Sequence, residues 1–239
     1  MARVPRQIGT AARDDRPAQP AAPGRHGPDR TVSGSYHHGD LRAALLAAAE
    51  AELVEAGLAG FSLRGTARRA RVSHGAPAHH FANADALLGA LADAGFARLA
   101  ERMARDMAAA GAAPRQRLAA AGRAYIAFAQ AHPQLFRLMF FGGRLQRLAG
   151  ACTDGAGASD APVEAFGLLR GCVEAVMEPT ASATAIAAGI TASWGLVHGI
   201  ANLLIEDAMG FMAPLDAGQR QAVIDDALER LIGAFERAA

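Results

Sequence analysis

The stretch that decides the fold is ARRARVSHGAPAHHFANADALLGAL, residues 67–91, in which a proline and three histidines separate two segments that favour helix. Proline is harmless only in the first turn of a helix, where its missing N–H has no partner. A short helix that contains Pro77 is therefore expected to begin with His74 as its cap, with Phe81 as its anchor to the core. So short a helix buries little of itself, which leaves its side chains and free N–H groups for a partner such as the major groove of DNA.

The sequence around this stretch predicts an all-α chain. Alanine and leucine dominate it, and no convincing period-2 strand is present. Before the stretch, Gly57 is expected to end a first helix, and Ser62 is expected to cap a second over Leu63–Ala70, so that three helices form a helix-turn-helix. After it, helices are expected over about 83–110, 114–131, 133–141, 162–177, 181–207 and 217–237.

Composition divides the chain into three predicted regions. Residues 1–35 are rich in Pro, Gly and Arg, lack hydrophobic periodicity and are expected to be disordered. Residues 36–85 hold five of the eight histidines and have no net charge, and residues 86–239 form a mildly acidic body. The net charge is +1 and every basic residue is Arg. This placement of charge suits a nucleic-acid-binding head with a regulatory body.

Other classes of protein receive little support. The N-terminus has no apolar leader, and the uncharged stretch Pro179–Ile205 is poor in Leu and Ile, so a buried helix of a cytoplasmic protein is expected instead of a membrane span. Cys152 and Cys172 are interpreted as reduced structural thiols, with a redox switch as the alternative. No nucleophile elbow or phosphate-binding glycine loop indicates an enzyme, and no cofactor is expected. Adjacent helical histidines diverge by about 100°, so no metal is expected either.

Residues 38–91 closely resemble the DNA-binding domain of TetR-type transcriptional repressors. The resemblance depends on the spacing of F-S-L, A-R-R-A, V-S, H-F and A-L-L, and extends loosely over residues 36–239. YHHGDLR and SWGLVHGIANLL resemble the branch whose C-terminal domain has a Trp-His-Gly signature. The resemblance implies about nine helices, with a DNA-binding domain over residues 36–85 and a ligand-binding and dimerisation domain over residues 86–239. It also implies a homodimer that binds a palindromic double-stranded DNA operator and is released by a small apolar or mixed-polarity effector. The DNA-contacting residues it implies are Ser62, Arg64, Arg68, Arg71, Ser73, His74, Gly75, Ala76, His79 and His80. The alternative for His74, His79 and His80 is that they are polar surface residues without a DNA contact.

The chain departs from the family at four positions. Arg71 replaces a glycine at the end of the second helix, and Gly65 replaces the acid of a capping box. Ala78 and Ala84 stand where the family has a Tyr and a Lys that contact phosphates. Two contacts to the DNA backbone are therefore missing. Their loss predicts a weaker salt dependence of DNA binding, unless Arg68, Arg71 or the Arg-rich extension supplies replacement contacts. The alternative is a TetR-fold dimer with weakened DNA binding that acts through a small molecule or a protein.

The C-terminal half supplies candidates for two further sites. Trp194, His198 and Asn202 lie one turn apart on an uncharged helix, where they either pack structurally or line a cavity. An enzyme that used this face would need a bound cofactor. The predicted ligand-binding residues are Phe128, Met139, Phe140, Phe166, Met177, Trp194, His198 and Asn202. Apolar stripes on the last two helices, one of which includes Ser193, predict a four-helix dimer seam formed by Ile190, Val197, Leu204, Ile224, Leu228, Leu231 and Phe235.

Overall fold

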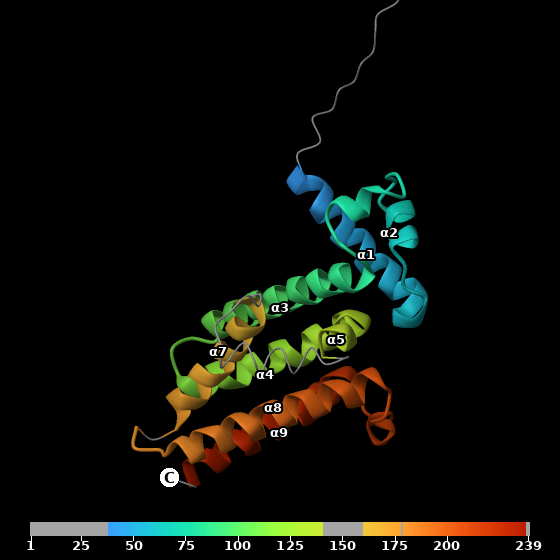
Figure 1. The fold of residues 1–239 in the computed structure, drawn as a ribbon. Helices are drawn as coiled ribbons and strands as arrows, with labels where there is room; N and C mark the ends of the chain where they lie inside the picture. The colour runs from blue at the N-terminus through green and yellow to red at the C-terminus, as the bar shows by residue number, and fades with distance from the viewer. Residues whose placement is uncertain (1–37, 141–159, 178, 238–239) are drawn as a thin grey trace, which may run out of the picture. The chain divides into compact units, whose positions relative to one another are not determined.

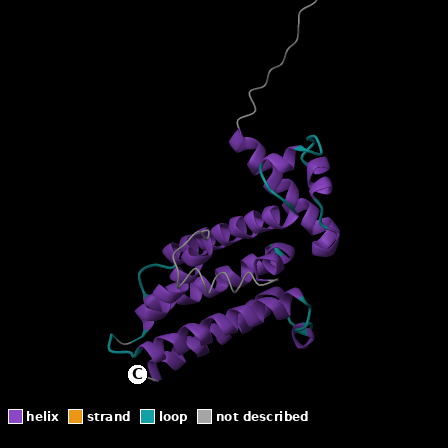
Figure 2. Ribbon diagram, viewed as in Figure 1, coloured by secondary structure: helices purple, strands orange, loops and turns teal. Residues whose placement is uncertain are grey.

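The computed structural model describes residues 38–140, 160–177 and 179–237, which all belong to one unit of the chain, His37–Ala239. Within these residues every regular element is a helix, so the all-α prediction is confirmed (Figures 1 and 2). The elements are α1 (His38–Gly60), α2 (Leu63–Arg69), the 3-10 turn η1 (Ala76–His79), α3 (Ala84–Ala109), α4 (Pro114–Ala131), α5 (Pro133–Phe140), α7 (Asp160–Val176), α8 (Ala183–Ile205), the 3-10 turn η2 (Gly210–Met212) and α9 (Ala217–Arg237).

The first helix follows its hydrophobic spacing. Leu45, Ala49 and Leu53 are four residues apart on α1, and all three are buried. Gly57 adopts φ +66° and ψ 177°, which interrupts the helical backbone where the sequence predicts its end. α1 contacts α2, α3 and α5.

Local capping sets the starts of the later helices. The Asn83 side chain accepts a 2.8 Å hydrogen bond from the Ala86 N–H at the start of α3. Asp216 and Gln219 form a reciprocal capping box at the start of α9, with bonds of 2.8 and 2.9 Å. Pro114 opens α4, where its lack of an N–H costs nothing. The predicted bounds of these helices therefore agree with the structure to within a few residues.

The body of the protein is built from helices that lie side by side. α3 packs against α4 and α7, and α4 also contacts α8 and α9 (Figure 1). Their facing sides are apolar, and Leu91, Leu99 and Phe136 are among the largest fully buried side chains. This bundle forms one continuous core with α1, because Leu45 and Leu53 belong to the same cluster of buried residues.

α8 is the one helix in the described part of the chain that is long and apolar enough to cross a membrane, judged by length and composition alone. Its inner side contacts α4, α7 and α9. Only 28% of its most apolar stretch is buried, however, so much of its surface is not covered by the other described residues of its own chain.

Some sequence predictions fall outside the described residues. These are the disordered extension over residues 1–35 and Cys152. Cys172, by contrast, is buried with its Sγ 3.8 Å from Met107 Sδ, and burial raises the pKa of its thiol. That environment keeps the thiol protonated and unreactive.

Candidate functional site

Between α2 and α3 the chain makes the single turn η1, which is held at both ends. The Ala78 N–H donates to the Gly75 carbonyl at 3.1 Å, and the Phe81 N–H donates to the Pro77 carbonyl at 2.8 Å. Pro77 and Phe81 are both buried. The Arg42 guanidinium lies 5.4 Å from the centre of the Phe81 ring, within range of a cation–π contact. The prediction that Phe81 anchors this segment is confirmed.

The segment is shorter than the sequence predicts. A short helix capped by His74 is expected, whereas the structure has one 3-10 turn that follows Gly75. Asn83 is already extended, with φ −161°, because it caps α3. His80, with φ −114°, already closes the single turn at its C-terminal end.

This recognition turn, which we define as residues 73–80, presents its polar side chains outward. The prolyl ring faces the core, while the backbone on both sides of it stays at the surface. The side chains are therefore available to a partner that approaches from solvent. The exposed positions are Ser73, His74, Gly75 and His79, and the half-buried positions are Ala76 and His80.

α2 ends in a left-handed residue at the position where the sequence predicts one. Arg71 adopts φ +55°, its N–H donates to the Arg68 carbonyl, and the Val72 N–H donates to the Ala67 carbonyl at 3.1 Å. These two bonds form a Schellman motif, in which glycine usually occupies the place of Arg71. Arg64, Arg68 and Arg71 are all exposed. A non-glycine residue is therefore kept in a conformation that costs about 1 kcal/mol.

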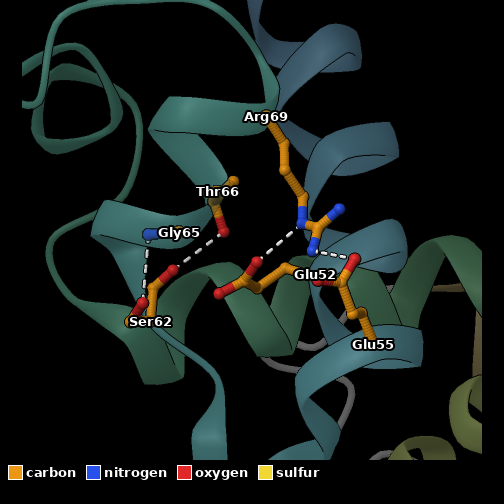
Figure 3. A network of polar contacts seen from close by, with 6 residues as sticks. All are labelled: Glu52, Glu55, Ser62, Gly65, Thr66 and Arg69. Carbon is orange, nitrogen blue, oxygen red and sulfur yellow. Dashed lines mark hydrogen bonds and ion pairs between the residues drawn. The ribbon is translucent and has the colours of Figure 1, made fainter.

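Ser62 is engaged within its own helix. Its Oγ accepts a 3.0 Å hydrogen bond from the Gly65 N–H, and its carbonyl accepts one from Thr66 Oγ1 at 3.1 Å (Figure 3). The predicted N-cap is confirmed. A contact of the same hydroxyl with DNA stays a prediction.

The absence of the capping-box acid at position 65 has a structural reason that the sequence does not reveal. A Cβ added to Gly65 would lie 1.7 Å from Oε1 of Glu52, which reaches across from α1 (Figure 3). Glu52 is 4% exposed and accepts a 2.6 Å bond from Arg69 Nε, while Arg69 also pairs with Glu55. The one signal for this contact is the position of Glu52 on the inward stripe of α1.

A second candidate site is a cavity of about 430 Å³ lined by α3, α4, α5, α7, α8 and α9. Its volume lies in the range of about 300–1,000 Å³ typical of small-molecule sites. Its lining is almost wholly apolar, and the described residues contribute no charged side chain to it. The aromatic members of the lining are Phe96, Tyr125, Phe140, Phe166 and Trp194.

Three polar aromatic side chains satisfy one another beside this cavity. Tyr125 Oη lies 2.8 Å from His198 Nδ1 and accepts a 3.4 Å hydrogen bond from Trp194 Nε1. Burial raises the pKa of Tyr125 and lowers that of His198, so both groups are neutral near pH 7. In the tautomer of His198 with an unprotonated Nδ1, the phenol donates its proton to that nitrogen. The sequence analysis selected Trp194 and His198 but missed Tyr125, which reaches them from α4.

The predicted ligand-binding residues divide into two groups. Phe140, Phe166 and Trp194 line the cavity. The other five do not line it. Phe128 and Met139 are core residues, and Met177 packs near Gly189. His198 contacts Tyr125, and the Asn202 amide donates to the His198 carbonyl of its own helix.

The predicted dimer stripe needs correction, because part of it faces the interior of its own subunit. Val197 and Leu228 are 6% and 3% exposed, and both reach Gly122 of α4. A Cβ added at Gly122 would lie 2.9 Å from Leu228 Cδ2, so this glycine permits the close approach of α9. The cavity is lined by three members of the stripe, Val197, Leu228 and Leu231. A fourth member, Ile224, is buried. The remaining members pack half-buried against the core: Ile190, Leu204 and Phe235.

A polar cluster connects α1 to the body. Arg98 of α3 donates a 2.7 Å hydrogen bond to Glu50 of α1, and its other Nη lies 3.1 Å from Nε2 of His132, between α4 and α5. Burial, and then the charge of Arg98, lowers the pKa of His132. The ion pair of Arg98 with Glu50 thus links α3 to α1. No three metal-ligating side chains come together anywhere in the described ranges.

Comparisons with known proteins agree with these observations. Residues 118–231 match the family described as Tetracyclin repressor-like, C-terminal domain. A protein of unknown function from Rhodococcus sp. RHA1 is 34% identical, with a TM-score of 0.58, and the alignment covers 86% of this chain and 98% of that one. None of the curated proteins matches the chain.

Two further solved structures share the fold. A transcriptional regulator from Rhodococcus sp. Rha1 is 22% identical over 83% of this chain and 97% of that one, with a TM-score of 0.51. A TetR variant from Acinetobacter baumannii AYE, solved with minocycline, is 21% identical over 84% and 97%, with a TM-score of 0.54.

Proposed function

Because the chain belongs to the TetR family of transcriptional regulators, we propose that it is a homodimeric, ligand-responsive repressor that binds a palindromic operator. The observation that supports this most directly is the recognition turn. Pro77 and Phe81 are buried, while His74 and His79 stay exposed on either side of Pro77. The two exposed imidazoles are therefore accessible for hydrogen bonds to base edges or phosphate oxygens.

Arginines beside the turn supply the electrostatic part of the proposed DNA contact. Arg64 and Arg68 lie on the exposed side of α2, and Arg71 follows directly after it. Arginine binds phosphate oxygens through a planar fork of donors. Ala78 is exposed and cannot donate to a phosphate, so these arginines are proposed to replace the missing anchors of the family.

The second copy is proposed to pack on the outer face of α8, which we define by its exposed residues Ala188, Ala192, Gly195 and Leu203. Ala188, Ala192 and Gly195 are four and three residues apart, and Leu203 lies eight residues, about two turns, further along, a spacing that keeps all four on one side of the helix. A Cβ at Gly195 would meet nothing within 4 Å among the described residues of its own subunit. This face replaces the buried part of the stripe predicted from the sequence, while the half-buried Ile190 and Leu204 flank it.

Effector control is proposed to act through α3. This helix begins at Ala84, directly after the recognition turn, and its residues Phe96, Leu99 and Met103 line the cavity. A ligand that fits the cavity better in one position of α3 shifts the population toward that position. The bond from Arg98 to Glu50 transmits the movement to α1 and changes the separation of the two recognition turns. The protein is accordingly proposed to act in the cytoplasm, as the sequence suggests.

A gel-shift assay with the DNA upstream of the chain's own gene tests the proposal. Submicromolar, sequence-specific retention is expected for the native chain. Loss of retention is expected when His74 and His79 are both replaced by Ala, with Ala82→Ser, outside the turn, as the control. Ala78 motivates a second candidate, a dimer that binds a small molecule or a protein and has lost strong DNA binding. Retention that is weak and independent of sequence would favour that candidate.

A further inference from the structure

One hydroxyl group in the cavity lacks a hydrogen-bond partner. Ser193 on α8 is 3% exposed and lines the cavity, and its Oγ is the one buried side-chain N or O atom in the described residues that makes no hydrogen bond. A buried hydroxyl without a partner costs about 1–3 kcal/mol. Because buried polar groups in proteins nearly always have a hydrogen-bond partner, the exception at Ser193 calls for an explanation.

The hydroxyl does not take the partner that its own helix offers. Serine and threonine within helices commonly donate to the carbonyl four residues earlier. Thr191, two residues away on the same helix, makes this bond to Ala187 at 2.8 Å. Ser193 Oγ makes no such hydrogen bond, and Ser193 lies on the side of α8 that borders the cavity. The group is thus free to bond a molecule inside the cavity.

The other polar groups of the lining are already paired with each other. Tyr125 Oη bonds to His198 Nδ1 and to Trp194 Nε1, which accounts for the phenol proton and the indole N–H. No charged side chain from the described residues reaches the cavity. A buried ionic ligand would therefore have no counter-charge there, which makes its desolvation costly.

We propose that the cavity binds an uncharged, mainly apolar ligand with a single hydrogen-bonding oxygen, a hydroxyl or a carbonyl, which pairs with Ser193 Oγ. The inference rests on the proposed role of the cavity as the effector site. It narrows the effector from an apolar or mixed-polarity compound to a neutral alcohol, phenol or ketone whose body contacts aromatic rings and aliphatic side chains. An aliphatic or aromatic skeleton suits the lining equally, since Phe166 and Trp194 lie beside Leu169 and Leu228.

The chain contains its own reporter for this binding. Trp194 is the only tryptophan of the sequence, and it lines the cavity. Its fluorescence can be followed while the full-length protein is titrated with three probes that share one chain length: 1-decanol, decanoate and decyltrimethylammonium. Saturable binding of decanol at least tenfold tighter than that of either ion is expected. Tighter binding of decanoate or of the ammonium ion, or no saturable response to decanol, would overturn the inference.

A pair of variants tests the role of the hydroxyl. Ser193→Ala is expected to weaken decanol binding about tenfold, because the oxygen of the ligand then loses its partner. The same variant should unfold at a temperature no lower than the native chain, since it removes an unsatisfied group. Thr191→Ala is the matched control and should bind decanol as the native chain does. Unchanged decanol binding by Ser193→Ala would refute the assignment.

The two proposals can fail separately. Operator retention in the gel shift needs no ligand, so a cavity that ignores decanol leaves DNA binding intact and overturns this inference alone. If Ser193→Ala does not fold, the preference of the native protein among the three probes still decides the outcome.

Discussion

The Glu52 carboxylate occupies the space that a side chain at position 65 would need, with Oε1 1.7 Å from the position of an ideal Cβ. The contact joins α1 to α2 and leaves Glu52 4% exposed, in an ion pair with Arg69. The glycine at position 65 and the buried acid at position 52 therefore form one structural unit. The orientation of α2, and so of its exposed arginines, depends on it.

Gly65→Ala should destabilise the protein by about 1–3 kcal/mol, the usual cost of forcing extra volume into a packed site. The new methyl group would push the Glu52 carboxylate away from Arg69. Thermal unfolding measures the loss. Gly75→Ala is the matched control, since an added Cβ there meets nothing within 4 Å and φ is −83°. Equal melting temperatures for the two variants would contradict this account of Gly65.

Arg71→Gly should separate stability from DNA binding. Glycine relieves the left-handed strain, which should raise the free energy of unfolding by about 1 kcal/mol. If Arg71 contacts a phosphate, the variant also loses operator affinity, and the slope of log K against log salt falls by about one. Asp207→Gly is the control, because Asp207 has φ +52° at the end of α8, far along the chain from the recognition turn. An unchanged salt slope for Arg71→Gly would remove this residue from the DNA contact.

Much of the fold could be predicted because its signals are local. Ser62, Asn83 and Pro114 each mark a helix start through their own backbone chemistry, and the structure confirms all three. The left-handed conformation at Arg71 was expected from the family resemblance instead, because the family has a glycine at this position.

The interior of the body was less predictable, since it depends on contacts between distant segments. Val197 and Leu228 belong to apolar stripes that suggest a dimer seam. Both side chains instead pack against α4, where Gly122 leaves room for them. Tyr125 and Ser193 belong to the cavity because of the helices opposite them, and no pattern within either helix indicates this. The length of η1 was missed because the sequence predicts a short helix from His74, whereas the segment makes a single 3-10 turn that follows Gly75.

Stability should fall as the pH drops below about 6.5, the ordinary pKa of histidine. Burial lowers the pKa of His198, so between its folded-state pKa and 6.5 the unfolded chain takes up a proton that the folded chain does not. Protonation of Nδ1 also ends its role as acceptor for Tyr125. Unfolding by urea at pH 8 and at pH 5.5 should show a smaller pH effect for His198→Asn than for the native chain. Equal pH effects would exclude His198 as a source of acid sensitivity.

Gly195→Leu should separate the proposed dimer without unfolding its subunits. The position is exposed and open within its own chain, so the new side chain can only obstruct a second copy on the outer face of α8. Size-exclusion chromatography with light scattering measures the mass. Gly171→Leu on α7 is the control, since it is equally open and lies on another helix. A Gly195→Leu protein that still has the mass of two chains would place the seam elsewhere.

The most direct test of the central claim is a hydroxyl-radical footprint of the native protein on the DNA upstream of its own gene. If two recognition turns are presented at a fixed separation by a paired body, the footprint should show two symmetric half-sites whose centres lie about 34–36 Å apart, or a multiple of that distance. A single protected patch, or uniform protection along the fragment, would contradict the account.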